Sequence, residues 1–143
     1  MGNVKRFEEL IAWQAGRTLA AKIYAATTGA AWKQDRRLVS QIRAAAVSVN
    51  SNIAEGYERG SPADFHKFLV MAKASCAEVR SQLYTARDVG HLPEADFQTL
   101  LALTECVSRL VGGLREAVRK RITANGAMSK VQCATSPKIG RNP

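Results

Sequence analysis

The sequence is poor in aromatic residues and in proline: aromatic residues make up 6% of its 143 residues, and only four prolines occur. It has no apolar run close to the ~20 residues that a membrane-spanning helix needs. The first ten residues, MGNVKRFEEL, lack the apolar stretch of a signal peptide, and Arg6 stands where a myristoylation motif has Ser or Thr. We therefore expect a cytoplasmic protein without a membrane partner.

Cysteine is scarce as well, with only Cys76, Cys106 and Cys133. Their number is odd, their spacing is wide and no CxxC pair occurs, which argues against a disulfide framework or a zinc site. Cys76 and Cys106 fall at apolar positions of predicted helices, where free cysteine packs as a small hydrophobic residue. We expect both thiols to be buried and chemically inert.

The residues that most catalytic sites need are also missing. The chain has two histidines, His66 and His91, and no HExxH motif, glycine-rich phosphate loop or DxD pair. Glu55 and Glu58 lie three residues apart, but a di-iron site needs Glu-x-x-His on two helices, and no helix supplies it. We expect His91 to be exposed in a turn. The sequence therefore predicts no enzyme, no metal site and no cofactor.

What the sequence does contain is alanine, leucine, isoleucine and valine at helical spacing, and its length fits a single domain. Glycines, prolines and capping residues divide this pattern into four helices. They are expected from Phe7 to Thr27, from Asp35 to about Arg59, from Ser61 to about Gly90 and from Pro93 to about Ile122. Because the connections are short, we predict an all-α, antiparallel up-down-up-down four-helix bundle over residues 5–122. Residues 123–143 lose the periodicity and predict a basic disordered tail.

The stretch 38–64 has two helical faces, and the rest of the chain is organised around it. One face is an apolar stripe suited to a bundle core, with Asn52 and Gly56 in its register and Glu55 beside them. We interpret these three as structural: a buried Asn52 would fix the register, and Gly56 would allow close packing. The alternative for Asn52 is a polar docking site for RNA or a small ligand. The opposite face carries small residues, which let another helix approach closely, and we predict a homo-oligomer interface there: Ser40, Ala44, Val47, Ser51 and Ala54.

Basic residues are the positive functional signal, since the net charge is +9. Residues 115–143 alone hold seven basic residues against one acidic residue, Glu116. Clusters of Lys and Arg on one surface are typical of phosphate binding. The candidate nucleic-acid-binding residues lie in three clusters: Arg36, Arg37 and Arg43; Lys73, Arg80 and Arg87, which continue a seven-residue spacing from His66; and Arg119, Lys120 and Arg121. The alternative is that they pair with acidic residues on neighbouring helices, such as Glu78, Glu105 and Glu116.

Two segments, FEELIAWQAGRTLAAKIY and the stretch from Leu38 to Leu92, resemble the bacterial four-helix bundle protein family. That family was first noticed as an open reading frame within intervening sequences of large-subunit ribosomal RNA genes. The resemblance covers residues 5–118, and its most specific part is SNIAEGYERGSPADF at 51–65. Where this chain has Asn50, the family usually has proline.

The family is similar to the accessory variability determinant of diversity-generating retroelements, which forms a basic pentameric barrel. The resemblance implies a homopentamer that binds RNA or DNA without sequence specificity, with a reverse transcriptase as a further partner. We therefore predict a non-catalytic, basic, oligomeric nucleic-acid-binding protein of RNA or retroelement accessory type. A protein-interaction scaffold with an acidic protein partner and no nucleic-acid role stays open as the alternative.

Overall fold

The computed structural model describes the backbone of residues 3–134 and the side chains of residues 3–126. This part of the chain is all-helical and contains no β-strand. A short 3₁₀-helix, η1 (Phe7–Glu9), precedes five α-helices. These are α1 (Ile11–Ala26), α2 (Ala30–Gln34), α3 (Arg36–Glu58), α4 (Pro62–Asp88) and α5 (Glu94–Ala134). None of the helices within the described residues is long and apolar enough to cross a membrane.

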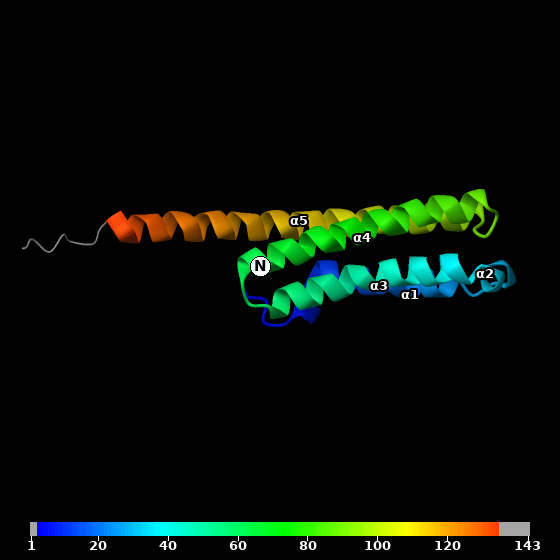
Figure 1. The fold of residues 1–143 in the computed structure, drawn as a ribbon, viewed down its shortest axis with the longest axis horizontal. Helices are drawn as coiled ribbons and strands as arrows, with labels where there is room; N and C mark the ends of the chain where they lie inside the picture. Colours follow the sequence, from blue (N-terminus) through cyan, green and yellow to red (C-terminus); the bar gives the residue numbers. More distant parts are fainter. Residues whose placement is uncertain (1–2, 135–143) are drawn as a thin grey trace, which may run out of the picture.

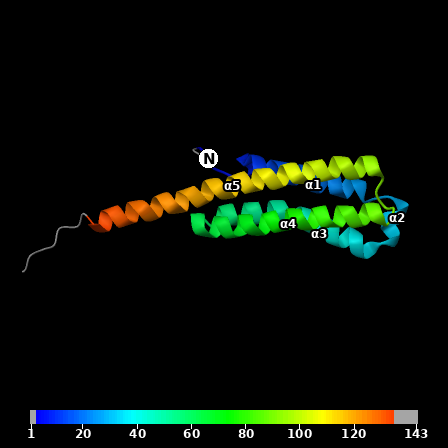
Figure 2. The same ribbon diagram turned by 90° about the horizontal axis from the view of Figure 1, so that it is seen from above.

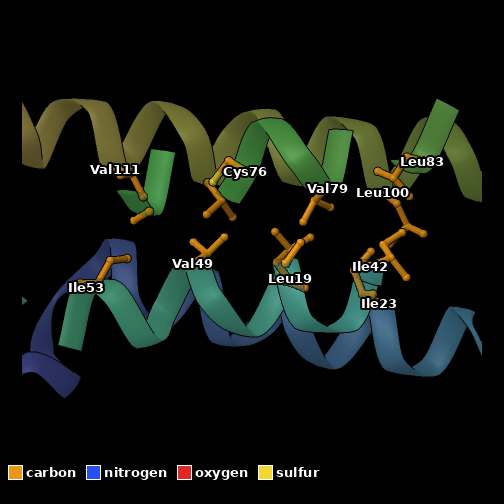
Figure 3. Close-up of a cluster of buried hydrophobic side chains, with 14 of the residues drawn as sticks. Leu19, Ile23, Ile42, Val49, Ile53, Cys76, Val79, Leu83, Leu100 and Val111 are labelled. Carbon is orange, nitrogen blue, oxygen red and sulfur yellow. The ribbon is translucent and has the colours of Figure 1, made fainter. Parts of the chain in front are cut away.

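The four long helices pack around one core. Figure 1 shows α1 and α3 together on one side of the molecule and α4 and α5 on the other. Turned by 90°, the view places α3 beside α4 and α1 beside α5 (Figure 2). Every long helix contributes fully buried side chains, among them Leu19, Ile42, Val79 and Val111 (Figure 3). Burial of each such side chain contributes about 1.5–3 kcal/mol, so the shared core is the main source of stability.

The ends of α3 and α4 agree with the capping signals in the sequence. The Asp35 carboxylate accepts a hydrogen bond from the Leu38 backbone N–H at 3.2 Å, and the Ser61 hydroxyl accepts one from the Asp64 N–H at 3.3 Å. Two glycines adopt the left-handed conformation at the turns, Gly60 with φ of 76° and Gly90 with φ of 82°. These caps and turns fix where α3 and α4 begin and end.

The predicted first helix is divided, and a short helix follows it. Leu10 has extended backbone angles (φ −69°, ψ 123°), which separate η1 from α1. The Glu9 carboxylate accepts hydrogen bonds from the N–H groups of Lys5 and Arg6 at 2.7 and 3.0 Å, and these bonds stabilise the separate first turn. Beyond Gly29, α2 buries Trp32 against the core. Its five residues are too few to show a helical period in the sequence.

The expected end of the last helix at Ile122 is wrong, because α5 continues to Ala134. The sequence loses its apolar stripe after Ile122, but a helix outside the core does not need one. Half of residues 123–134 have high helix propensity, including Ala124, Ala127 and Met128, and α5 continues through the less favourable Asn125 and Gly126. The remainder of the predicted tail, residues 135–143, lies outside the described residues.

The prediction for the cysteines holds for Cys76 only. Cys76 is fully buried in α4, and this burial raises the pKa of its thiol to about 11. Cys106 is exposed, contrary to expectation. Thr104 and Val107 are the buried positions of this turn of α5. Cys106 lies between them in the sequence, and its side chain points away from the core. The side chain of Cys133 lies outside the described residues.

Candidate nucleic-acid and subunit interfaces

The basic stripe on α4 lies along its seam with α5. The Lys73 Nζ donates hydrogen bonds to the backbone carbonyl and the hydroxyl of Ser108, both at 3.0 Å. Gly112 leaves the space for this contact, because a Cβ there would lie 3.2 Å from the Lys73 Nζ. Lys73 is half-buried and connects the two helices across the seam.

The two arginines of the stripe face acidic residues. Arg80 lies 4.0 Å from the Glu105 carboxylate of α5, with both side chains nearly half exposed. Arg87 lies 3.4 Å from Asp88 and 3.9 Å from Glu94. Its guanidinium also stacks over the ring of Phe97, 4.3 Å from the centroid. The ion pair between Arg80 and Glu105 agrees with the alternative to phosphate binding that the sequence left open. His66, at the start of the stripe, is half-buried.

At the start of α3, the three arginines differ in their surroundings. The Arg43 Nε donates to the Thr27 hydroxyl at 2.9 Å, and its guanidinium lies 4.5 Å from the centroid of the Tyr24 ring. These contacts connect α3 to the end of α1. Arg36 and Arg37 are exposed.

The basic cluster on α5 lies where the helix leaves the core. Val118 is fully buried, whereas the next three residues are exposed. Arg119 donates two hydrogen bonds to Glu116, at 2.9 and 2.6 Å, and this bonding lowers the pKa of the Glu116 carboxyl. Lys120 and Arg121 form no ion pair within the described residues. Arg121 and Ala117 of α5 border a cavity of about 720 Å³. Its other lining residues come from the segment before η1, from α3, from the α3–α4 turn and from α4: Val4, Tyr57, Gly60, Ser61, Pro62 and Phe65.

The small-residue face of α3 forms the floor of an open groove of about 880 Å³. Four of the predicted interface residues line it and are exposed: Ser40, Ala44, Val47 and Ser51. Ala54 lies further along the same face and is half-buried. The end of α1 and helix α2 supply one wall, including Tyr24, Trp32 and Lys33. The structure thus places the predicted interface residues beside the basic start of α3, and we name this feature the α3 groove.

Asn52 lies at the edge of the α3 groove and is half-buried, not in the core as its register predicted. Its Nδ2 donates to the backbone carbonyl and hydroxyl of Ser48 at 2.8 and 3.0 Å. The Ser48 hydroxyl shares a hydrogen bond of 2.8 Å with that of Ser75 on α4. The Asn52 Nδ2 therefore bonds within α3, and Ser48 connects this pair to Ser75 of α4.

The other two residues interpreted as structural lie near the end of α3. Gly56 is buried, and a Cβ added to it would lie 2.5 Å from the Cβ of Phe68 on α4. Glu55 is exposed and pairs with Arg59 at 3.2 Å, so its contact is local.

One polar contact was missed by the sequence analysis. The His91 Nε2 lies 3.0 Å from the Asp35 Oδ2, and its ring lies 5.4 Å from that of Trp32. The imidazole is half-buried and not exposed in the turn as expected. Two hydrogen bonds lower the pKa of the Asp35 carboxyl: the one from the Leu38 N–H has the larger effect, and the one with His91 adds to it. The residues lie 56 positions apart in the chain, so no local pattern indicates the contact.

Within the described residues, no group of three or more His, Cys, Asp or Glu side chains is placed to hold a metal ion. The described residues offer three candidate surfaces: the basic end of α5, the exposed arginines at the start of α3 and the α3 groove.

Comparison with known proteins identifies the family. A solved structure with a similar fold is a protein of unknown function from the S23 ribosomal protein family of Bacteroides thetaiotaomicron, with a TM-score of 0.68. The two sequences are 17% identical, and the match covers 73% of this chain and 98% of that one. No curated protein matches the sequence. Residues 8–113 match the family described as 23S rRNA-intervening sequence protein. This match spans most of the chain, and the protein therefore belongs to the 23S rRNA-intervening sequence protein family.

Proposed function

We propose that this protein is a non-catalytic, oligomeric nucleic-acid-binding protein of the cytoplasm, and that RNA is its main ligand. The family name refers to ribosomal RNA, and the similar solved structure comes from a ribosomal protein family, which supports an RNA-related role. The observation that carries the proposal is the basic end of α5, where Lys120 and Arg121 are exposed next to Arg119. Glu116 is the one acidic residue from position 115 onward.

Nucleic-acid phosphates bind side chains that can exchange water for a phosphate without first breaking a buried contact. Lys120 and Arg121 meet this condition, and so do Arg36 and Arg37 at the other end of the core. Lys73 and Arg43 do not, because each is held by hydrogen bonds to a neighbouring helix. We therefore assign the α5 cluster the main role in phosphate binding and the α4 stripe a stabilising role.

The proposed unit of assembly is an antiparallel up-down-up-down four-helix bundle, and five copies are the expected number. Three pairs of contacts support this helix order: Thr27 with Arg43, Ser48 with Ser75, and Lys73 with Ser108. Each joins consecutive long helices. The exposed small residues that line the α3 groove support a subunit contact there. A reverse-transcriptase partner remains a prediction from the resemblance.

Fluorescence anisotropy of a labelled RNA at several salt concentrations tests the function. Micromolar or weaker affinity at physiological salt is expected, because binding without sequence specificity comes largely from counterion release. The R119A/K120A/R121A variant should lower the slope of log affinity against log salt by about two units on single strands. The matched control is K73A/R80A/R87A, which removes the same charge. It should lower the free energy of unfolding and leave the salt slope near the wild-type value.

Two results would contradict the proposal. Equal loss of salt slope in both triple variants would show that the α4 stripe binds phosphate as strongly as the α5 cluster. Absence of binding to RNA, single-stranded DNA and duplex DNA at low salt would exclude a nucleic-acid role. The alternative, a scaffold for an acidic protein, would then be the remaining function.

A further inference from the structure

The cavity beside Arg121 is built from three segments that meet at one end of the bundle. Figure 1 shows the start of the chain, the α3–α4 turn and the outgoing part of α5 at this end. The Tyr57 hydroxyl donates a hydrogen bond to the backbone carbonyl of Val4 at 3.1 Å, which ties the first segment to α3. Most of the lining comes from the SNIAEGYERGSPADF motif at 51–65, to which the proposed function assigns no role. We name this cavity the Arg121 pocket.

The walls of the Arg121 pocket are held by contacts within the protein. The rings of Tyr57 and Phe65 pack edge to face, with centroids 5.9 Å apart and an interplanar angle of 88°. Gly60, with φ of 76°, sets the turn, and Ser61 caps α4. The volume of about 720 Å³ lies within the range of about 300–1,000 Å³ that is typical of sites for small organic groups. A ligand that enters orders little of the protein, and such preorganisation favours binding.

The lining suits a group that is partly apolar and carries a negative charge at one side. Apolar and aromatic surface comes from Tyr57, Pro62 and Phe65, and the Ser61 hydroxyl can donate a hydrogen bond. Among the described residues that line the pocket, Arg121 is the only charged one. An anion beside the pocket is therefore attracted by the guanidinium and meets no carboxylate in the lining.

Arg121 also connects the pocket to the basic end of α5. Ala117 and Arg121 lie four residues apart and therefore share the face of the helix that borders the pocket. Lys120 is exposed next to them. A phosphodiester backbone that binds Lys120 and Arg121 thus passes the edge of the pocket. The bases of a single strand can leave the stack and bind between apolar and aromatic side chains, whereas those of a duplex are paired and stacked.

We propose that the Arg121 pocket receives one unstacked nucleobase of a single-stranded RNA whose phosphates bind Lys120 and Arg121. This inference rests on the proposed function and deepens it, because it adds a base site to the phosphate-binding cluster. The rings of Tyr57 and Pro62 contact the base, and the Ser61 hydroxyl bonds to its edge. One side-chain hydroxyl is too few to distinguish four bases, which agrees with binding without sequence specificity.

Filling the pocket without changing its charge tests the proposal. Ala117→Phe adds an aromatic ring to the lining at a half-buried position of α5. In anisotropy at low salt, this variant should bind a labelled single-stranded RNA about tenfold more weakly, because the base loses its contacts. Competition by inorganic polyphosphate, which has no bases, should be unchanged.

Ala102→Phe is the matched control for this substitution. It places the same ring at an exposed position of α5, away from the pocket, and should leave the affinities for RNA and polyphosphate unchanged. Circular dichroism confirms that both variants are folded.

Photo-cross-linking locates the base in the wild-type protein and does not depend on the folding of any variant. A single-stranded RNA that contains thiouridine is irradiated in the complex, and the attached peptide is identified by mass spectrometry. The cross-link should fall within residues 57–65. A duplex RNA of the same length should give much less of this product, because its bases stay paired.

The proposed function and the base site fail in different ways. A wild-type protein that binds no RNA excludes the nucleic-acid role and the base site with it. RNA binding that Ala117→Phe leaves unchanged overturns the base site alone, and so does RNA binding without a cross-link in residues 57–65. Equal weakening of RNA and polyphosphate binding by Ala117→Phe also overturns it, because the loss would then not involve a base.

Discussion

Gly56 is the position where the packing of α3 against α4 leaves least space. An added Cβ would lie 2.5 Å from the Phe68 Cβ and 3.1 Å from the Phe65 ring, so α3 and α4 would have to move apart. Alanine also has the higher helix propensity, worth about 1 kcal/mol, which offsets part of this cost. The same substitution at Gly113 meets no atom within 4 Å.

We predict that Gly56→Ala lowers the free energy of unfolding by about 1–2 kcal/mol, since overpacking of a core typically costs 1–3 kcal/mol. Gly113→Ala, the matched control, should raise it by up to about 1 kcal/mol because only the propensity changes. Urea denaturation followed by circular dichroism measures both. Equal effects of the two substitutions would show that the close approach at Gly56 carries no packing cost.

Among the elements, the junction of α2, α3 and the α4–α5 turn depends on one carboxylate. Asp35 caps α3 through the Leu38 N–H and holds His91 of the turn. Because the folded state lowers the pKa of the Asp35 carboxyl, the stability it provides is present above its unfolded pKa. That stability is lost as the pH falls through the lower pKa that Asp35 has in the folded state.

Acidification below about pH 4 should therefore lower the melting temperature of the wild type more than that of Asp35→Asn. The variant lacks the titrating carboxylate at this junction, so its stability should be lower at neutral pH and should change less with acid. Glu116→Gln provides a comparison, because it removes another carboxyl of lowered pKa away from the junction. Its ion pair with Arg119 is solvent-exposed, so this variant should flatten the pH curve less than Asp35→Asn does. Parallel pH curves for the wild type and Asp35→Asn would contradict the assignment.

The caps show which elements the sequence can predict. The ends of α3 and α4 could be predicted from local patterns, because capping and turn residues affect only the backbone next to them. These residues are Asp35, Ser61, Pro62, Gly60 and Gly90. The pairing of His91 with Asp35 could not be predicted in this way, because it depends on segments brought together by folding. The break at Leu10 is local, but Glu8 and Glu9 suit the first turn of one continuous helix equally well. The seven-residue spacing placed Lys73 correctly at the edge of a helix seam. It could not distinguish a phosphate ligand from a contact to Ser108, since both need a lysine in that position.

For the whole molecule, the direction of the helices relates assembly to nucleic-acid binding. Figure 1 shows α5 continuing past the other long helices at one end of the molecule. If the copies of a ring are related by an axis parallel to their helices, every α5 emerges on the same side. The basic clusters at Arg119, Lys120 and Arg121 then gather on one face of the ring. A single RNA strand can contact several of them, and their contributions combine through effective concentration.

Dissociating the ring should therefore weaken binding to a long RNA far more than binding to a short one. We predict that Ala44→Arg, which places a charge in the predicted subunit interface on α3, lowers the affinity for an RNA long enough to reach several subunits by about 100-fold or more. The affinity for an oligonucleotide that reaches one α5 should not fall, since the substitution adds a positive charge and leaves the cluster intact. Anisotropy with both lengths at one salt concentration measures the difference, and light scattering coupled to size exclusion shows whether the ring has dissociated. Equal affinities of wild type and Ala44→Arg for the long RNA, with the ring dissociated, would show that each subunit binds alone.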